Sequence, residues 1–77
     1  MKIIGYALCL DNSEYEMSLD GRKIYPIIEP YENDTVKGFV RIVDESGEDC
    51  LYSDKRFAVI DLSPQIKKEV EKSLALT

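Results

Sequence analysis

The sequence contains no histidine and no tryptophan, and only two cysteines. Histidine is the side chain that ordinarily exchanges protons near neutral pH, and it is a common metal ligand. Because Cys9 and Cys50 lie far apart, no CxxC pair exists, which excludes a zinc ribbon and a dithiol redox motif. We therefore expect no catalytic residue, no cofactor and no metal site.

Long apolar runs are also absent. No stretch approaches the roughly 18–20 apolar residues needed to span a bilayer. Near the N-terminus there is one lysine, Lys2, followed by a short apolar run that ends at Asp11 and Asn12. This pattern is unlike a secretory signal. These features predict a cytoplasmic protein without a membrane segment, whose two cysteines are half-buried thiols.

Positive charge is scarce. Ten Lys and Arg residues stand against 15 Asp and Glu residues, giving a net charge of −5, which argues against a surface built to neutralise phosphate. The basic residues include three separated pairs, Arg22-Lys23, Lys55-Arg56 and Lys67-Lys68. Their convergence would make a local basic patch, so a nucleic-acid-associated factor is the alternative function.

A length of 77 residues allows one domain, and 44% hydrophobic residues exclude a disordered acidic tail. Strand-forming residues dominate four segments, the third of which folds back on itself as a hairpin. Pro26 predicts that the second strand lies at a sheet edge or contains a bulge, since proline cannot donate to a ladder. The segments are residues 2–11, 22–30, 38–52 and 58–62.

The most regular segment is residues 38–52, in which Ser46-Gly47 is typical of a two-residue hairpin turn. This turn predicts that Ile42 faces Leu51 and that Arg41 faces Tyr52. In that register Val40, Ile42 and Leu51 form the core face. Arg41, Val43, Cys50 and Tyr52 share the other face.

The C-terminal segment has the signature of an amphipathic helix. Ser63 is a suitable cap, and Pro64 is preorganised for the first helical position. Ile66, Val70 and Leu74 recur at spacings of four, and Lys67, Lys68, Glu71 and Lys72 lie opposite. The apolar stripe either packs on the rest of the domain or binds a partner.

The order of these elements resembles the Src-homology-three type of small barrel. In that fold a single helical turn connects the fourth strand to the fifth, and residues 51–62 occupy the matching place, with Ser53 where a proline is common. The expected fold is therefore mainly β: a five-stranded antiparallel SH3-like barrel in residues 1–62, followed by an α-helix in residues 63–77.

A second resemblance is to short, uncharacterised bacterial proteins. The residues that carry it are Tyr6-Ala7-Leu8, Lys23 with Tyr25, and the G-x-x-R-hydrophobic-hydrophobic-D-E-S-G-E-D-x-L-Y motif from Gly38 to Tyr52. The resemblance implies a fold and a bacterial cytoplasmic setting. It supplies no activity.

Four carboxylates, those of Asp44, Glu45, Glu48 and Asp49, gather around the hairpin turn. Like charges facing each other in a ladder are unfavourable, so something must offset them. Contact with a basic partner is one explanation, and the folding back of Arg41, Lys55 and Arg56 onto the turn is another. Calcium or magnesium is a third, but the spacing lacks the alternation of a calcium loop.

Five tyrosines and two phenylalanines supply aromatic surface. Tyr31 and Tyr52 are the candidates for a peptide-binding groove, because tyrosine buries a ring and keeps a polar tip. The structural alternative places Tyr6, Phe39 and Phe57 in the core and leaves Tyr25 and Tyr52 half-buried. Arg41 would then make a cation–π contact with Tyr52.

These patterns predict a small non-enzymatic interaction or regulatory module that binds a protein partner, as a monomer or weak homodimer. Cys50 has no histidine base, and a chain of this size has little room for a closed catalytic pocket. The predicted binding residues are Tyr31, Arg41, Asp44, Glu45, Glu48, Asp49 and Tyr52.

Overall fold

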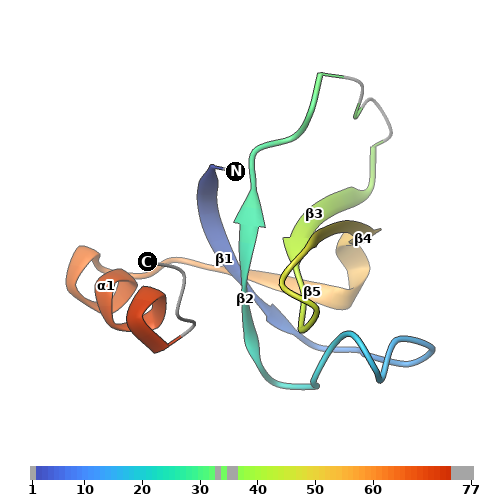
Figure 1. The fold of residues 1–77 in the computed structure, drawn as a ribbon, viewed down its shortest axis with the longest axis horizontal. Coiled ribbons are helices and arrows are strands. Elements are labelled where there is room, and N and C mark those ends of the chain that lie inside the picture. Colours follow the sequence, from blue (N-terminus) through green and yellow to red (C-terminus); the bar gives the residue numbers. More distant parts are fainter. Residues whose placement is uncertain (1, 33, 35–36, 74–77) are drawn as a thin grey trace.

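The computed structural model describes residues 2–32, 34 and 37–73, which form one antiparallel sheet and a C-terminal helix (Figure 1). This confirms the mainly β class, with five strands and a helix. The predicted helical connection before the last strand is a short 3₁₀ helix, η1. The elements are β1 (Ile3–Cys9), β2 (Ile24–Ile28), β3 (Phe39–Val43), β4 (Asp49–Ser53), η1 (Asp54–Arg56), β5 (Phe57–Ile60) and α1 (Pro64–Ser73).

The strands lie in the order β4-β3-β2-β1-β5, so β5 returns to pair with β1. Cys9 of β1 is opposite Phe57 of β5, and Tyr6 is opposite Ile60. Strands β4 and β5 stand at the two ends of this order. Within the described residues the sheet is not closed, so the predicted barrel is not confirmed.

The prediction that Pro26 marks an edge strand is wrong, because β2 lies between β1 and β3. The Cys9 amide donates to the Lys23 carbonyl at 2.8 Å. Because alternate residues of an antiparallel strand bond the same neighbour, the backbone groups of Tyr25 and Ile27 also face β1. The nitrogen of Pro26 therefore faces β3, where only Ile27 and Ile42 are registered as partners in the described sheet. Proline occupies a position where few ladder bonds form. The bulge of this region lies in β1, between Ile3 and Gly5.

The β3–β4 hairpin exists, but its register differs from the prediction by one residue. Val43 pairs with Asp49, and Arg41 pairs with Leu51. The Gly47 amide donates to the Asp44 carbonyl at 3.0 Å, and Gly47 has φ +83°. This is the pattern of a three-residue loop with a glycine bulge, in place of the two-residue turn.

The shift of register exchanges the faces of β4. Tyr52 is buried with Ile42, whereas Leu51 is 43% exposed and shares a face with Arg41. Leu51 is thus not a core residue, and Arg41 does not face Tyr52. Asp44 explains the difference, because its side chain accepts the Ser46 amide at 2.9 Å and so starts the turn one residue earlier.

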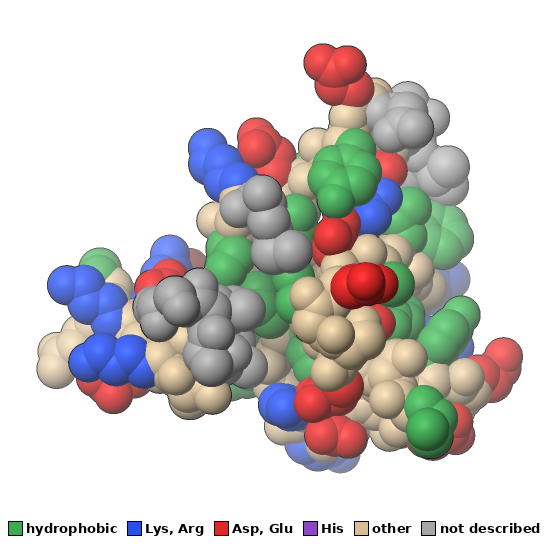
Figure 2. Space-filling model, viewed as in Figure 1, with side chains coloured by type: hydrophobic (Ala, Val, Ile, Leu, Met, Phe, Trp, Pro, Cys, Tyr) green, Lys and Arg blue, Asp and Glu red, His purple; other side chains and the backbone are tan. Residues whose placement is uncertain are grey.

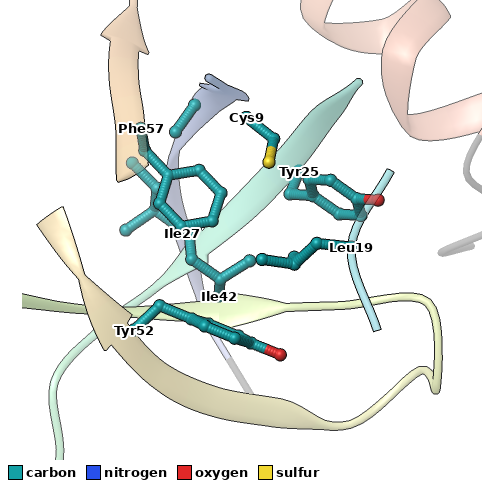
Figure 3. Close-up of a cluster of buried hydrophobic side chains, with 8 residues drawn as sticks. Cys9, Leu19, Tyr25, Ile27, Ile42, Tyr52 and Phe57 are labelled. Atoms are coloured by element: carbon teal, nitrogen blue, oxygen red, sulfur yellow. The ribbon is translucent and has the colours of Figure 1, made fainter. Parts of the chain in front are cut away.

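A hydrophobic core cluster lies on one side of the sheet, where side chains from all five strands converge with Leu19 of the β1–β2 loop (Figure 3). Tyr52 packs edge-on against Phe57, with ring centroids 6.0 Å apart. The predicted core positions of Tyr6 and Phe57 are confirmed, but Phe39 is 50% exposed. The cluster consists of Ala7, Cys9, Leu19, Tyr25, Ile27, Ile42, Tyr52 and Phe57.

Helix α1 begins as predicted. The Ser63 hydroxyl accepts the Ile66 amide at 3.3 Å, and the Ser63 carbonyl accepts the Lys67 amide. Figure 1 shows α1 on the side of the molecule away from the β3–β4 hairpin. Glu71, expected on the solvent side, accepts a hydrogen bond from the buried Tyr6 hydroxyl at 3.2 Å. Leu74, the last residue of the predicted stripe, lies outside the described residues.

Ile66 is 49% exposed, and no residue of Pro64–Ser73 is fully buried.

Among the described residues, no helix has the length and apolar character that crossing a membrane would require.

The hairpin loop leads to a stability prediction. Gly47→Ala forces a side chain into positive φ, although nothing lies within 4 Å of its Cβ position. We expect a loss of about 1 kcal/mol in the free energy of unfolding, measured with urea. Gly21→Ala is the control, because Gly21 has no positive φ and its Cβ would meet only ordinary contacts. Equal effects of the two substitutions would contradict the loop geometry.

Candidate functional site

Asp44 is buried inside the hairpin turn. Its carboxylate accepts the Tyr52 hydroxyl at 2.6 Å on one oxygen and the amide and hydroxyl of Ser46 on the other. Burial alone would raise the pKa of Asp44, but these hydrogen bonds outweigh it and lower the pKa below its usual value. This carboxylate organises the turn and is not free for a partner.

Glu45 connects the same turn to the long β1–β2 loop. Its carboxylate accepts the Tyr25 hydroxyl at 2.6 Å and pairs with the Lys23 ammonium at 2.7 Å. Hydrogen bonds from Lys23 and then Tyr25 lower the pKa of Glu45. The Tyr25 hydroxyl in turn accepts the Asp20 amide at 2.6 Å. The turn is therefore held by internal partners, and Lys23, rather than Lys55 or Arg56, supplies the cation to Glu45.

Arg41 lies between two aspartates. Its guanidinium makes a bidentate contact with Asp34, with both distances 2.9 Å, and reaches Asp49 at 3.1 Å. The side chains of Arg41 and Asp34 are only 13% and 12% exposed. Hydrogen bonds from Arg41 lower the pKa of Asp34, and those to Asp34 raise the pKa of Arg41. This contact joins the loop after β2 to the β3–β4 hairpin.

Tyr31 covers this ion pair. The ring of Tyr31 lies over the guanidinium, with the Arg41 Cζ atom 4.0 Å from the ring centroid, and the Tyr31 hydroxyl donates to Asp49. Two further hydrogen bonds join Asp34 to Tyr31: the Asp34 amide donates to the Tyr31 carbonyl at 2.9 Å, and the Tyr31 amide donates to the Asp34 carboxylate at 3.0 Å. We call Tyr31, Asp34, Arg41 and Asp49 the arginine cluster.

An apolar groove of about 220 Å³ adjoins the arginine cluster. Three of its side chains, Ile4, Phe39 and Leu51, are 54%, 50% and 43% exposed. Figure 2 shows apolar, acidic and basic side chains meeting at the surface in this upper part of the molecule. The groove is lined by Ile4, Ile27, Ile28, Pro30, Asp34, Phe39, Val40, Arg41 and Leu51.

Six of the seven predicted binding residues fall into two groups, and Glu48 belongs to neither group. Tyr31, Arg41 and Asp49 come together in the arginine cluster. Asp44, Glu45 and Tyr52 are engaged inside the hairpin and its contact with the β1–β2 loop, while Glu48 is exposed.

Sequence reasoning missed Asp34 and the groove residues Ile4, Phe39 and Leu51. Asp34 is the last residue of a turn that begins at Tyr31, and its carboxylate reaches back to accept the Tyr31 amide, which no turn pattern in the sequence marks. Nothing in the local pattern marked Phe39 or Leu51 as exposed, because they are typical strand residues.

The chain matches no protein-family model, no curated protein and no solved structure. The resemblance to short bacterial proteins therefore stays a prediction.

The thiols differ from the expected half-buried pair. Both are free, Cys9 is fully buried, and Cys50 is exposed. Partial burial and the neighbouring carboxylate of Asp44 raise the pKa of the Cys50 thiol. Cys50 is consequently protonated and weakly nucleophilic near neutral pH.

Asp44→Asn tests the role of the buried carboxylate. The substitution weakens the contacts with Tyr52 and Ser46, so we expect it to cost roughly 1–3 kcal/mol at neutral pH. Because the native pKa of Asp44 lies below its ordinary 3.8, its contribution is present above that pH and is lost as the pH falls through the native pKa. The difference from the unmodified protein should therefore shrink in acid. Urea unfolding at neutral and acidic pH measures it.

Glu48→Gln is the matched control, since Glu48 is exposed and its carboxylate has no hydrogen bond or ion pair in the described part of the chain. We expect a change near zero at both pH values. A pH-independent effect of Asp44→Asn would contradict the assigned role.

Arg41→Lys tests the arginine cluster. Lysine cannot reproduce the bidentate contact with Asp34, so we expect the Asp34 amide to exchange with solvent faster by about an order of magnitude. Nuclear magnetic resonance measures this exchange, with the Ile42 amide of the core as the internal reference. Arg22→Lys is the control, because Arg22 is exposed. Unchanged exchange at Asp34 would show that the guanidinium does not hold the loop.

Proposed function

We propose that this protein is a small non-enzymatic interaction module that binds a segment of a partner protein in the groove beside the arginine cluster. The observation that carries the proposal is that Ile4, Phe39 and Leu51 expose large apolar side chains around one hollow. Binding grooves are typically apolar, with a few placed polar groups that orient the ligand.

The arginine cluster supports the proposal by giving the groove a fixed wall. Arg41 and Asp34 line the groove while they are already paired with each other, so they need no rearrangement to receive a partner. Such preorganisation reduces the entropy lost on binding. Tyr31 lies on the same cluster with half of its surface exposed, and a tyrosine at this position suits a protein interface.

The sequence pattern predicts binding at the acidic end of the hairpin and its nearby tyrosines. The contacts instead favour the groove as the binding site. Asp44 and Glu45 already have internal partners, so their use by a ligand would require breaking those contacts. Tyr31, Arg41 and Asp49 remain beside the proposed site.

The alternative, a nucleic-acid-associated factor, receives less support. Lys23 is paired with Glu45, and Arg56 donates to the Ser13 carbonyl and covers the Tyr15 ring. The remaining pair, Lys67-Lys68, lies on α1, which Figure 1 separates from η1. This distribution does not favour a continuous basic stripe.

As part of the same proposal, we infer an SH3-like layout and a cytoplasmic setting. The strand order, with η1 between β4 and β5, is similar to that of the Src-homology-three type. Free thiols at Cys9 and Cys50 are typical of a reducing compartment.

Selection from a displayed library of random dodecapeptides tests the proposal. We expect peptides that bind the unmodified protein and lose at least about tenfold in affinity for Phe39→Asp, because the substitution places a charge in the apolar groove. Val59→Asp is the matched control, because Val59 is 76% exposed on β5 and does not line the groove.

Two outcomes would overturn the proposal. One is that repeated selection yields no peptide specific for the folded protein. The other is that the selected peptides bind the Phe39→Asp and Val59→Asp variants equally well.

A further inference from the structure

Strand β4 forms one end of the sheet, and hydrogen bonds fix which of its backbone groups face β3. The Asp44 amide donates to the Glu48 carbonyl at 3.2 Å, and the Asp54 amide donates to the Gly38 carbonyl at 2.9 Å. Because alternate residues bond across an antiparallel pair, Cys50 and Tyr52 bond β3. The amides and carbonyls of Asp49, Leu51 and Ser53 consequently face away from the sheet.

This outer edge is open in the described structure, where β3 alone pairs with β4. A row of backbone donors and acceptors at a sheet edge is a template for a further strand. Cys50 and Leu51 are both exposed, so this part of β4 is accessible from solution in the described structure.

The edge and the groove meet at Leu51. Its side chain lines the groove on the same face as Arg41, its cross-strand partner, while its backbone belongs to the outer edge. A strand added beside β4 would place alternate side chains on this face, next to Leu51. Main-chain hydrogen bonds and an apolar contact would then act together, as in other cases of strand addition.

Charge indicates the chemistry of the added strand. Glu48 precedes β4 and Asp54 follows it, both are exposed, and neither takes part in an ion pair among the described residues. A second copy of this chain, with its net charge of −5, would bring further carboxylates to the same edge. A segment with basic residues at both ends and apolar residues between them is complementary instead.

We propose that the outer edge of β4 receives an extended partner segment in antiparallel orientation, with basic residues opposite Glu48 and Asp54 and an apolar residue opposite Leu51. This inference rests on the proposed function and names the mode of binding and the class of partner.

The test uses a defined probe, the acetylated and amidated peptide Lys-Val-Thr-Ile-Thr-Val-Lys. In antiparallel addition its lysines face Glu48 and Asp54, and its central isoleucine faces Leu51. We expect saturable shifts in the nuclear magnetic resonance spectrum and slower hydrogen exchange of the Leu51 amide, since that amide acquires an acceptor. Replacing both lysines by glutamates should weaken binding by about tenfold.

Backbone methylation separates strand addition from simple occupation of the groove. N-methyl groups on the two valines and the isoleucine remove the donors that face β4 and should abolish binding. N-methyl groups on the two threonines point away from β4 and should leave the affinity within about twofold. The double variant Glu48→Lys with Asp54→Lys should reverse the charge preference and select the glutamate-ended peptide.

Three results would overturn the inference. The first is the absence of binding at millimolar probe. The second is equal binding of the two methylated peptides while groove residues still shift, which would leave the proposed function intact. The third is protection of the Leu51 amide without peptide, together with dimers in sedimentation, which would assign the edge to a second copy.

Discussion

The contact between Arg41 and its two aspartates is the interaction on which the loop after β2 and one wall of the groove both depend. It joins Asp34 in the loop after β2 to Asp49 at the start of β4, with the Tyr31 ring over the guanidinium. A mostly buried guanidinium is stabilised only when its donors are satisfied, and here both neighbours are carboxylates. The same contact forms one wall of the apolar groove, so the stability of the loop and the shape of the proposed site have a common origin.

The carboxylates around the hairpin turn thus serve mainly to stabilise the fold. Asp44 orders the hairpin loop, Glu45 joins that loop to the segment between β1 and β2, and Asp49 completes the arginine cluster. Three of the four carboxylates around the turn, those of Asp44, Glu45 and Asp49, have their own donors, which relieves much of the repulsion that the sequence implied. Glu48 and Asp54 flank β4 and are exposed, and in the proposed mode of binding they would favour a segment with basic ends.

Much of the fold follows from local pattern. Strand-forming runs and the cap at Ser63 were predictable, because each depends on residues close in sequence. The helical turn before β5 was expected only from the resemblance to the Src-homology-three layout. The hairpin register was not, since the side chain of Asp44 moved the start of the turn and so exchanged the exposures of Leu51 and Tyr52. The groove could not be predicted either. It requires Ile4, Phe39 and Leu51 to converge from three strands, and only the tertiary fold brings them together.

The most direct test of the central claim is a spectrum of the arginine Nε–H groups, which compares Arg41 with Arg22 and Arg56 in one sample. We predict that the Arg41 Nε–H, which donates to Asp34 at 2.9 Å, exchanges with water much more slowly than the Nε–H of the exposed Arg22. Exchange of the Arg41 Nε–H at the same rate as that of Arg22 would show that Asp34 does not hold the guanidinium, and the groove would then have no fixed wall.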